Sequence, residues 1–188
     1  YKLVLTGGEP TLHSNFFDLL KIFKNIPYIS IFTNGSKLDL LDDVPLINEI
    51  VLSIPSVDND LYRRLTGKDF SFIKNKIERF KDKSKISVHV VVNKFNVKKM
   101  EDLVRFTLHS GLKSISFAPI RSSENNSFSL NNLVLDNKDY VIMLEELRFL
   151  KNKYSSINIH IPTPIPLCML RKTNAFDLLS SIKKCNPG

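Results

Sequence analysis

The chain has 188 residues, 43% hydrophobic and 24% charged, which is long enough for a domain with a substantial core. No apolar run reaches the roughly 20 residues that a membrane-spanning helix needs, and the first residues do not have the layout of a signal peptide. The net charge is +8, but the Lys residues of segments such as 74–85 alternate with acidic ones, as on a solvated helix face. We therefore expect a cytoplasmic protein with neither a membrane nor a nucleic-acid partner.

The first predicted strand, Tyr1–Leu5, ends in a turn that contains Gly7, Gly8 and Glu9. Glycine allows positive φ angles and lets a ligand come close to the backbone. Glu9 adds an acceptor-only carboxylate, which suits an ammonium group, whereas a phosphate-binding loop needs Lys and free amides. The turn therefore predicts an amine-binding site, and the alternative is a plain solvated turn that closes the strand.

Strand and helix patterns alternate along the rest of the chain. Short β-branched and aromatic runs predict five further strands, at Tyr28–Thr33, Glu49–Ile54, Ile86–Val92, Ser114–Ala118 and Ile157–Ile161. Apolar residues at helical spacing predict helices that begin near Ser14 or Asn15, cover 72–80, run from Met100 to a cap at Gly111, and run from Asp136 to Tyr154. A short helix with Pro45 in its first turn is expected over Asp42–Asn48.

Repeated strand-helix-strand order implies right-handed crossovers and a mostly parallel α/β sheet. The order fits an open doubly wound sheet and a closed or partial barrel equally well. In both architectures, ligands bind at the carboxyl ends of the strands.

Polar residues stand at several of these strand ends. Asn34 follows the second predicted strand, where its amide could bind a ligand or only form an Asn-Gly turn. Ser53 is a polar side chain between apolar neighbours near the end of the third strand, and Asn96 follows the fourth. The spacing thus predicts a polar site along one edge of the sheet.

The string Thr-Gly-Gly-Glu-Pro-Thr at residues 6–11 resembles the Gly-Gly-Glu-Pro motif of radical S-adenosylmethionine (radical SAM) enzymes, which binds the cofactor's amino group. The order of the later strand ends agrees with this family over residues 1–121: a Thr-Asn-Gly turn, a Ser strand with an acidic loop at 58–67, an Asn-rich turn, and an apolar adenine contact at 117–120. The resemblance implies a partial (β/α)6-type TIM-like barrel. It also implies that the cofactor contacts are Gly7, Gly8, Glu9, Asn34, Ser53 and Asn96.

The family holds a 4Fe-4S cluster on a Cys-x3-Cys-x2-Cys motif, which the 188 residues do not contain. We expect residues 1–160 to be a radical SAM core truncated at its N-terminus, with the cluster ligands outside this chain. The alternative is a relative that has lost the cluster.

Two cysteines, Cys168 and Cys185, lie near the C-terminus. A disulfide is not expected in a reducing compartment, so they are either inert thiols or metal ligands. Cys185, three residues before Gly188, resembles the start of the cysteine-rich (SPASM-like) extension of peptide-modifying radical enzymes. We expect residues 161–188 to be a linker and the start of such an extension, with Cys185 and Cys168 as candidate ligands of an auxiliary iron-sulfur cluster.

The resemblance implies that the full-length protein reductively cleaves S-adenosylmethionine and uses the 5′-deoxyadenosyl radical to abstract hydrogen from a peptide, protein or small-molecule substrate. Flavodoxin or ferredoxin is the expected electron donor, and the fragment alone is expected to be inactive. The alternatives are a molybdopterin-precursor cyclase-like enzyme and a non-catalytic α/β binding module. The four dispersed histidines are expected to be structural.

Overall fold

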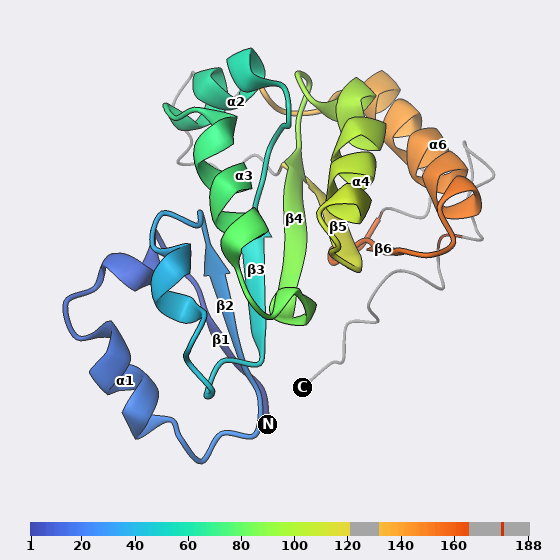
Figure 1. Ribbon diagram of the computed structural model, residues 1–188. Coiled ribbons are helices and arrows are strands. Elements are labelled where there is room, and N and C mark those ends of the chain that lie inside the picture. The colour runs from blue at the N-terminus through green and yellow to red at the C-terminus, as the bar shows by residue number, and fades with distance from the viewer. Residues whose placement is uncertain (121–131, 166–177, 179–188) are drawn as a thin grey trace.

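The computed structural model describes residues 1–120, 132–165 and 178. Six parallel strands form one sheet in the order β1-β2-β3-β4-β5-β6, which is also their order in the chain (Figure 1). The strands are β1 (Leu3–Leu5), β2 (Ile29–Thr33), β3 (Glu49–Ser53), β4 (Ile86–Val92), β5 (Ser114–Pro119) and β6 (Asn158–His160). The fold is a partial TIM-like α/β barrel, and all six predicted strands are confirmed, with bounds that differ from the prediction by no more than two residues at either end.

Helices connect the strands, and α3 and α4 cross in front of the sheet in Figure 1. The α-helices are α1 (Phe16–Ile22), α2 (Asn59–Thr66), α3 (Phe70–Arg79), α4 (Met100–His109) and α6 (Asn137–Lys153). Short 3₁₀ helices are η1 (Pro10–Leu12), η2 (Leu38–Leu41), η3 (Lys83–Lys85) and η4 (Val97–Lys99). In the part of the chain that the structure describes, no helix combines the length and apolar character needed to cross a membrane.

Two predicted connections are wrong. The helix expected over Asp42–Asn48 is absent, and the nearest helical turn, η2, ends at Leu41. The cause is Pro45, because the residue before a proline, here Val44, is disfavoured in helical conformation. The acidic loop expected at 58–67 is instead mostly helix α2. Asp58 caps this helix by accepting a hydrogen bond from Leu61 N at 2.9 Å, and Gly67 ends it with φ +73°.

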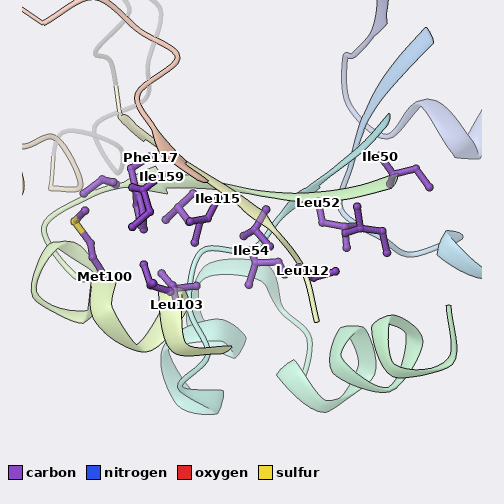
Figure 2. Packing of buried hydrophobic residues seen from close by; sticks show 14 of the residues in the cluster. Ile50, Leu52, Ile54, Met100, Leu103, Leu112, Ile115, Phe117 and Ile159 are labelled. Atoms are coloured by element: carbon purple, nitrogen blue, oxygen red, sulfur yellow. The ribbon is translucent and has the colours of Figure 1, made fainter. Parts of the chain in front are cut away.

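The core lies between the sheet and its helices. Alternate strand residues such as Ile50, Leu52 and Phe117 are fully buried. Figure 2 shows Phe117 on the side of the sheet that faces Met100 and Leu103 of α4. Burying one such side chain contributes about 1.5–3 kcal/mol. The intervening residues point to the opposite face of the sheet, which we call the inner face.

Candidate functional site

The glycine turn after β1 is open. Gly7 has φ +139°, and a Cβ atom added at Gly7 or Gly8 would meet no atom within 4 Å. The turn passes directly into η1, whose first residue is Pro10. The backbone of the turn is therefore accessible to a ligand, as the sequence predicts.

The carboxylate of Glu9 is held by four donors from the protein itself. Its Oε1 atom accepts from Thr11 N at 3.2 Å, Thr11 Oγ1 at 2.6 Å and Thr33 Oγ1 at 2.7 Å, and its Oε2 atom accepts from Asn34 N at 2.7 Å. A carboxylate has about four acceptor positions, and three of these four bonds end on Oε1, so any remaining capacity for a ligand is on Oε2. The contact between Glu9 and a cofactor stays a prediction. Glu9 thus joins the turn after β1 to the turn after β2, a connection that we call the Glu9 clamp.

The turn after β2 presents the Asn34 amide. Asn34 Oδ1 accepts a hydrogen bond from Ser36 N at 2.8 Å, and Gly35 N donates to Thr33 Oγ1 at 3.0 Å. Gly35 has φ +76°, and a Cβ atom there would lie 2.2 Å from Ile73 Cδ1. The Nδ2 group of the exposed Asn34 side chain donates no hydrogen bond to a described residue, which leaves this donor available to a ligand.

A hollow of about 360 Å³, which we call the upper hollow, lies beside this turn. It is lined by Asn34, Ser53, Pro55, Tyr62, Leu65, Thr66, Lys68, Val91 and Asn93. Two predicted site residues, Asn34 and Ser53, are therefore brought together, and the Glu9 clamp ties Asn34 to the glycine turn. Hydroxyl, amide and ammonium groups and apolar side chains together line this hollow, a combination that is typical of small-molecule sites.

Asn96 does not line the upper hollow. Its side chain is fully buried, its Nδ2 atom donates to Pro55 O at 2.9 Å and Val91 O at 3.0 Å, and its Oδ1 atom accepts from Asn93 N at 2.8 Å. These bonds connect the loop after β3 to the end of β4. The contact between Asn96 and a cofactor stays a prediction, and Asn93 is the asparagine of this loop that reaches the hollow.

Two further interactions join the segment after β3 to the segment after β4. Lys99 Nζ lies 2.9 Å from Asp58 Oδ2, and the Arg64 guanidinium lies 4.2 Å from the centre of the Phe95 ring. Hydrogen bonds from Leu61 N and Lys99 lower the pKa of Asp58. One wall of the upper hollow is thus fixed from several directions.

A second hollow of about 310 Å³, the lower hollow, opens on the inner face of the sheet. It is lined by Lys2, Val4, Phe32, Glu49, Val51, Ser87, His89, Ser116, His160 and Pro162. His89 Nδ1 lies 2.8 Å from Ser116 Oγ. Sequence reasoning missed these residues, although polar Ser87 and His89 alternate with apolar neighbours along β4, as expected of a strand with one polar face.

The charged groups of the lower hollow are paired. Glu49 accepts from Lys2 Nζ at 3.1 Å and from Ser30 Oγ at 2.9 Å. Burial raises the pKa of Glu49, but the hydrogen bonds from Lys2 and Ser30 outweigh it and leave the pKa below its ordinary value. Burial, together with repulsion from His160, lowers the pKa of His89, which favours a neutral imidazole.

The remaining predictions concern other parts of the chain. Cys168 and Cys185 lie outside the described residues. Phe117, predicted to begin the adenine contact, is fully buried among the core residues of Figure 2. Among residues 1–120, 132–165 and 178, no three His, Cys, Asp or Glu side chains gather in a way that could hold a metal ion.

The relatives of this chain include two proteins that are named probable GTP 3′,8-cyclase. The one from Sulfurisphaera tokodaii is 28% identical over 122 residues, which cover 59% of this chain and 38% of that protein. The one from Methanococcus aeolicus is 22% identical over an alignment of 220 positions, which covers 97% of this chain and 73% of that protein.

Among solved structures, Streptococcus suis SuiB superposes with a TM-score of 0.74 at 18% identity, covering 91% of this chain and 41% of SuiB. A further structure of SuiB contains the precursor peptide SuiA. This likeness shows a shared fold.

A family model described as the radical SAM superfamily matches residues 1–107, more than half of the chain. The match includes the glycine turn, the Glu9 clamp and both strand-end residues of the upper hollow, Asn34 and Ser53. The chain belongs to the radical SAM superfamily.

Proposed function

We propose that the full-length protein is an enzyme that binds S-adenosylmethionine across the glycine turn and the upper hollow. The observation that carries the proposal is the Glu9 clamp, because it fixes an open glycine turn against Asn34, which lines a hollow of about 360 Å³. When bound, a reduced 4Fe-4S cluster and S-adenosylmethionine supply a 5′-deoxyadenosyl radical for hydrogen abstraction.

The residues of this chain bind and orient the cofactor. Gly7 and Gly8 leave space for the methionyl end, since no side chain blocks their backbone. Asn34 donates an amide hydrogen and Ser53 a hydroxyl to the polar part of the nucleoside. Lys68, at the same hollow, offers a positive charge to a carboxylate.

Glu9 and Asn96 have positioning roles in this proposal. The Glu9 carboxylate sets the distance between the two turns, because its own acceptor positions are largely occupied. Asn96 holds Pro55 against β4 and so places Ser53 and Asn93 on the walls of the upper hollow.

The other cofactors and partners are proposed from the family. The cluster ligands would lie outside these 188 residues, and residues 161–188 would open an extension in which Cys185 and Cys168 bind an auxiliary cluster. Flavodoxin or ferredoxin would deliver the electron in the reducing cytoplasm.

Two substrate classes have support. A peptide or protein substrate is supported by the fold that the chain shares with SuiB, a protein solved with a precursor peptide. A GTP cyclase activity, the second candidate, is supported by the sequence relatives of that name.

The test is anaerobic reconstitution of the full-length protein with iron and sulfide, followed by measurement of 5′-deoxyadenosine after addition of S-adenosylmethionine and dithionite. Ser53→Ala and Asn34→Ala should each raise the KM for S-adenosylmethionine about tenfold, the equivalent of one lost hydrogen bond. Ser71→Ala, on the exposed surface of α3, is the matched control and should leave KM unchanged. A reconstituted protein that neither binds S-adenosylmethionine nor forms 5′-deoxyadenosine would contradict the proposal.

A further inference from the structure

A groove runs along the outer side of α3, where this helix contacts η2. It consists of two hollows of about 290 and 130 Å³ that border the same three charged residues, Asp39, Lys76 and Arg79. Phe72 and Asn75 complete the wall of the larger hollow. We call the two hollows together the outer groove, and its lining residues are distinct from those of the upper hollow.

The α3 side of the groove is one continuous stripe of the helix. Phe72, Asn75, Lys76 and Arg79 follow the spacing i, i+3, i+4, i+7, which places their side chains above one another. The Phe72 ring is 44% exposed, although it belongs to a large apolar side chain. Phe72 and Arg79 are two helical turns apart, a separation of about 10 Å.

Lys76 is a cation that the protein holds in place. Its Nζ atom forms an ion pair with Asp39 and lies 4.9 Å from the centre of the Phe72 ring. The Lys76 side chain is only 14% exposed, whereas that of Asp39 is 60% exposed. The ion pair neutralises both residues, so neither supplies net charge to a ligand.

Arg79 is the cation of the groove that no described residue neutralises. Its guanidinium forms neither an ion pair nor a hydrogen bond with residues 1–120, 132–165 or 178. The nearby Asp42 carboxylate instead accepts from Lys81 N at 3.1 and 3.2 Å through its two oxygens. Arg79 therefore offers a planar fork of donors, which fits a carboxylate.

The surrounding charges favour a single negative charge on the ligand. A dianionic phosphate at Arg79 would also approach the Asp39 and Asp42 carboxylates, and like charges across an interface lower affinity. The exposed Phe72 ring adds an apolar contact about 10 Å away. The groove thus fits a ligand that carries one carboxylate and one aromatic group at this separation.

A polyproline II segment has this geometry. It has three residues per turn and rises about 3.1 Å per residue, so side chains three positions apart lie on the same side and about 9 Å apart. A segment of this kind can place a carboxylate at Arg79 and an aromatic ring on Phe72 at the same time.

We propose that the outer groove is a docking site for a partner protein and that it receives an extended segment with an acidic and an aromatic residue three positions apart. The carboxylate pairs with Arg79, and the aromatic ring packs against Phe72. This surface is separate from the proposed cofactor site, so the proposal stands or falls independently of the proposed function.

The test measures binding of fluorescein-labelled peptides to the full-length protein by fluorescence polarisation. The probes are Phe-Pro-Pro-Glu-amide and Glu-Pro-Pro-Phe-amide, in which the proline pair favours polyproline II and the two orders cover both directions along α3. At least one probe should bind saturably. Replacing its Glu by Gln or by phosphoserine should weaken binding about tenfold, since the first loses the charged hydrogen bonds and the second meets Asp39 and Asp42.

Three variants assign the binding to the groove. Arg79→Gln and Phe72→Ala should each weaken binding about tenfold. Lys74→Gln is the matched control, because it removes the same charge from an exposed position of the same helix that does not line the groove. It should leave binding unchanged, and thermal unfolding of all three variants reports whether they are folded.

The proposal is overturned if neither probe binds at concentrations up to about 1 mM, or if the Gln peptide binds as well as the Glu peptide. It is also overturned if Lys74→Gln weakens binding as much as Arg79→Gln, because the effect would then be one of overall charge. Sedimentation velocity tests a second copy as the occupant. Self-association that Arg79→Gln abolishes and Lys74→Gln preserves would assign the groove to that copy and contradict the proposal.

Discussion

The Thr33 hydroxyl donates a hydrogen bond of 2.7 Å to Glu9 Oε1, although the two residues are 24 positions apart in the chain. Thr33 is the last residue of β2 and is 3% exposed, so this bond is shielded from competing water. Hydrogen bonds to a charged acceptor are stronger than those between neutral groups. The two turns that we assign to cofactor binding are therefore mechanically linked.

Thr33→Val should weaken this link while keeping the shape of the side chain. Glu9 would lose a donor and Gly35 N an acceptor, at a cost of about 1.5–3 kcal/mol in the free energy of unfolding. The affinity of the full-length protein for S-adenosylmethionine should fall about tenfold by calorimetry. Thr33→Ser, which keeps the hydroxyl, should restore most of the affinity, and equal affinities for the Val and Ser variants would refute the role of the clamp.

Asn96→Ala should be among the most destabilising substitutions of a polar residue in the described chain. It removes the Asn96 partner of Pro55 O and Asn93 N and one of the two side-chain donors to Val91 O, which costs about 2–4 kcal/mol. Urea unfolding of wild type and Asn96→Ala measures this loss in the free energy of unfolding. Asn25→Ala, at an exposed position, is the control and should change stability by less than about 0.5 kcal/mol.

Gly35→Ala and Gly67→Ala form a matched pair. Both glycines have nearly the same φ, +76° and +73°, so each substitution carries the same backbone penalty of about 1–2 kcal/mol. At Gly35 the new Cβ atom would also lie 2.2 Å from Ile73 Cδ1, whereas at Gly67 it meets no atom within 4 Å. We expect Gly35→Ala to be less stable than Gly67→Ala by about 1–3 kcal/mol in thermal unfolding; equal losses would show that Ile73 moves aside freely.

The stability that Glu49 contributes should depend on pH. Its pKa in the folded protein lies below the ordinary value of 4.5, because the hydrogen bonds from Lys2 and Ser30 outweigh the effect of burial. The ionised carboxylate therefore stabilises the fold above pH 4.5, and this contribution is lost as the pH falls through the lower, folded-state pKa. Urea unfolding should show a gap between wild type and Glu49→Gln that is constant from pH 7 to about pH 5 and narrows below it. If the difference in unfolding free energy between wild type and Glu49→Gln grew as the pH fell, the pKa of Glu49 would be raised in the folded protein, contrary to this prediction.

The strands could be predicted from the sequence because their residues repeat a strong local pattern. Runs such as Ile86–Val92 are β-branched and lie between turn residues, and the structure places β4 there without a shift. The helix over Asn59–Thr66 replaces the predicted loop, because Asp58 caps its first turn and Gly67 ends it, and both of these signals are local in the sequence.

The site could be predicted only in part. The position of Asn34 and Ser53 at one hollow could be predicted, because a parallel sheet brings the carboxyl ends of its strands to one edge. Their contact with a cofactor stays a prediction. The hydrogen bonds of the Glu9 carboxylate depend on a donor from β2, Thr33. The neighbouring positions of His89 and Ser116 depend on the register between β4 and β5. Local sequence contains neither kind of information.

Because spatial order equals chain order in this sheet, each strand-end turn borders only the turns of the preceding and the following strand. An insertion in the turn after one strand would therefore change contacts with the turns of the two neighbouring strands and leave the other strand-end turns in place. Such a fold tolerates the exchange of one connecting segment for another at little cost in stability. Differences in substrate selectivity are therefore expected in the connecting segments more than in the strands.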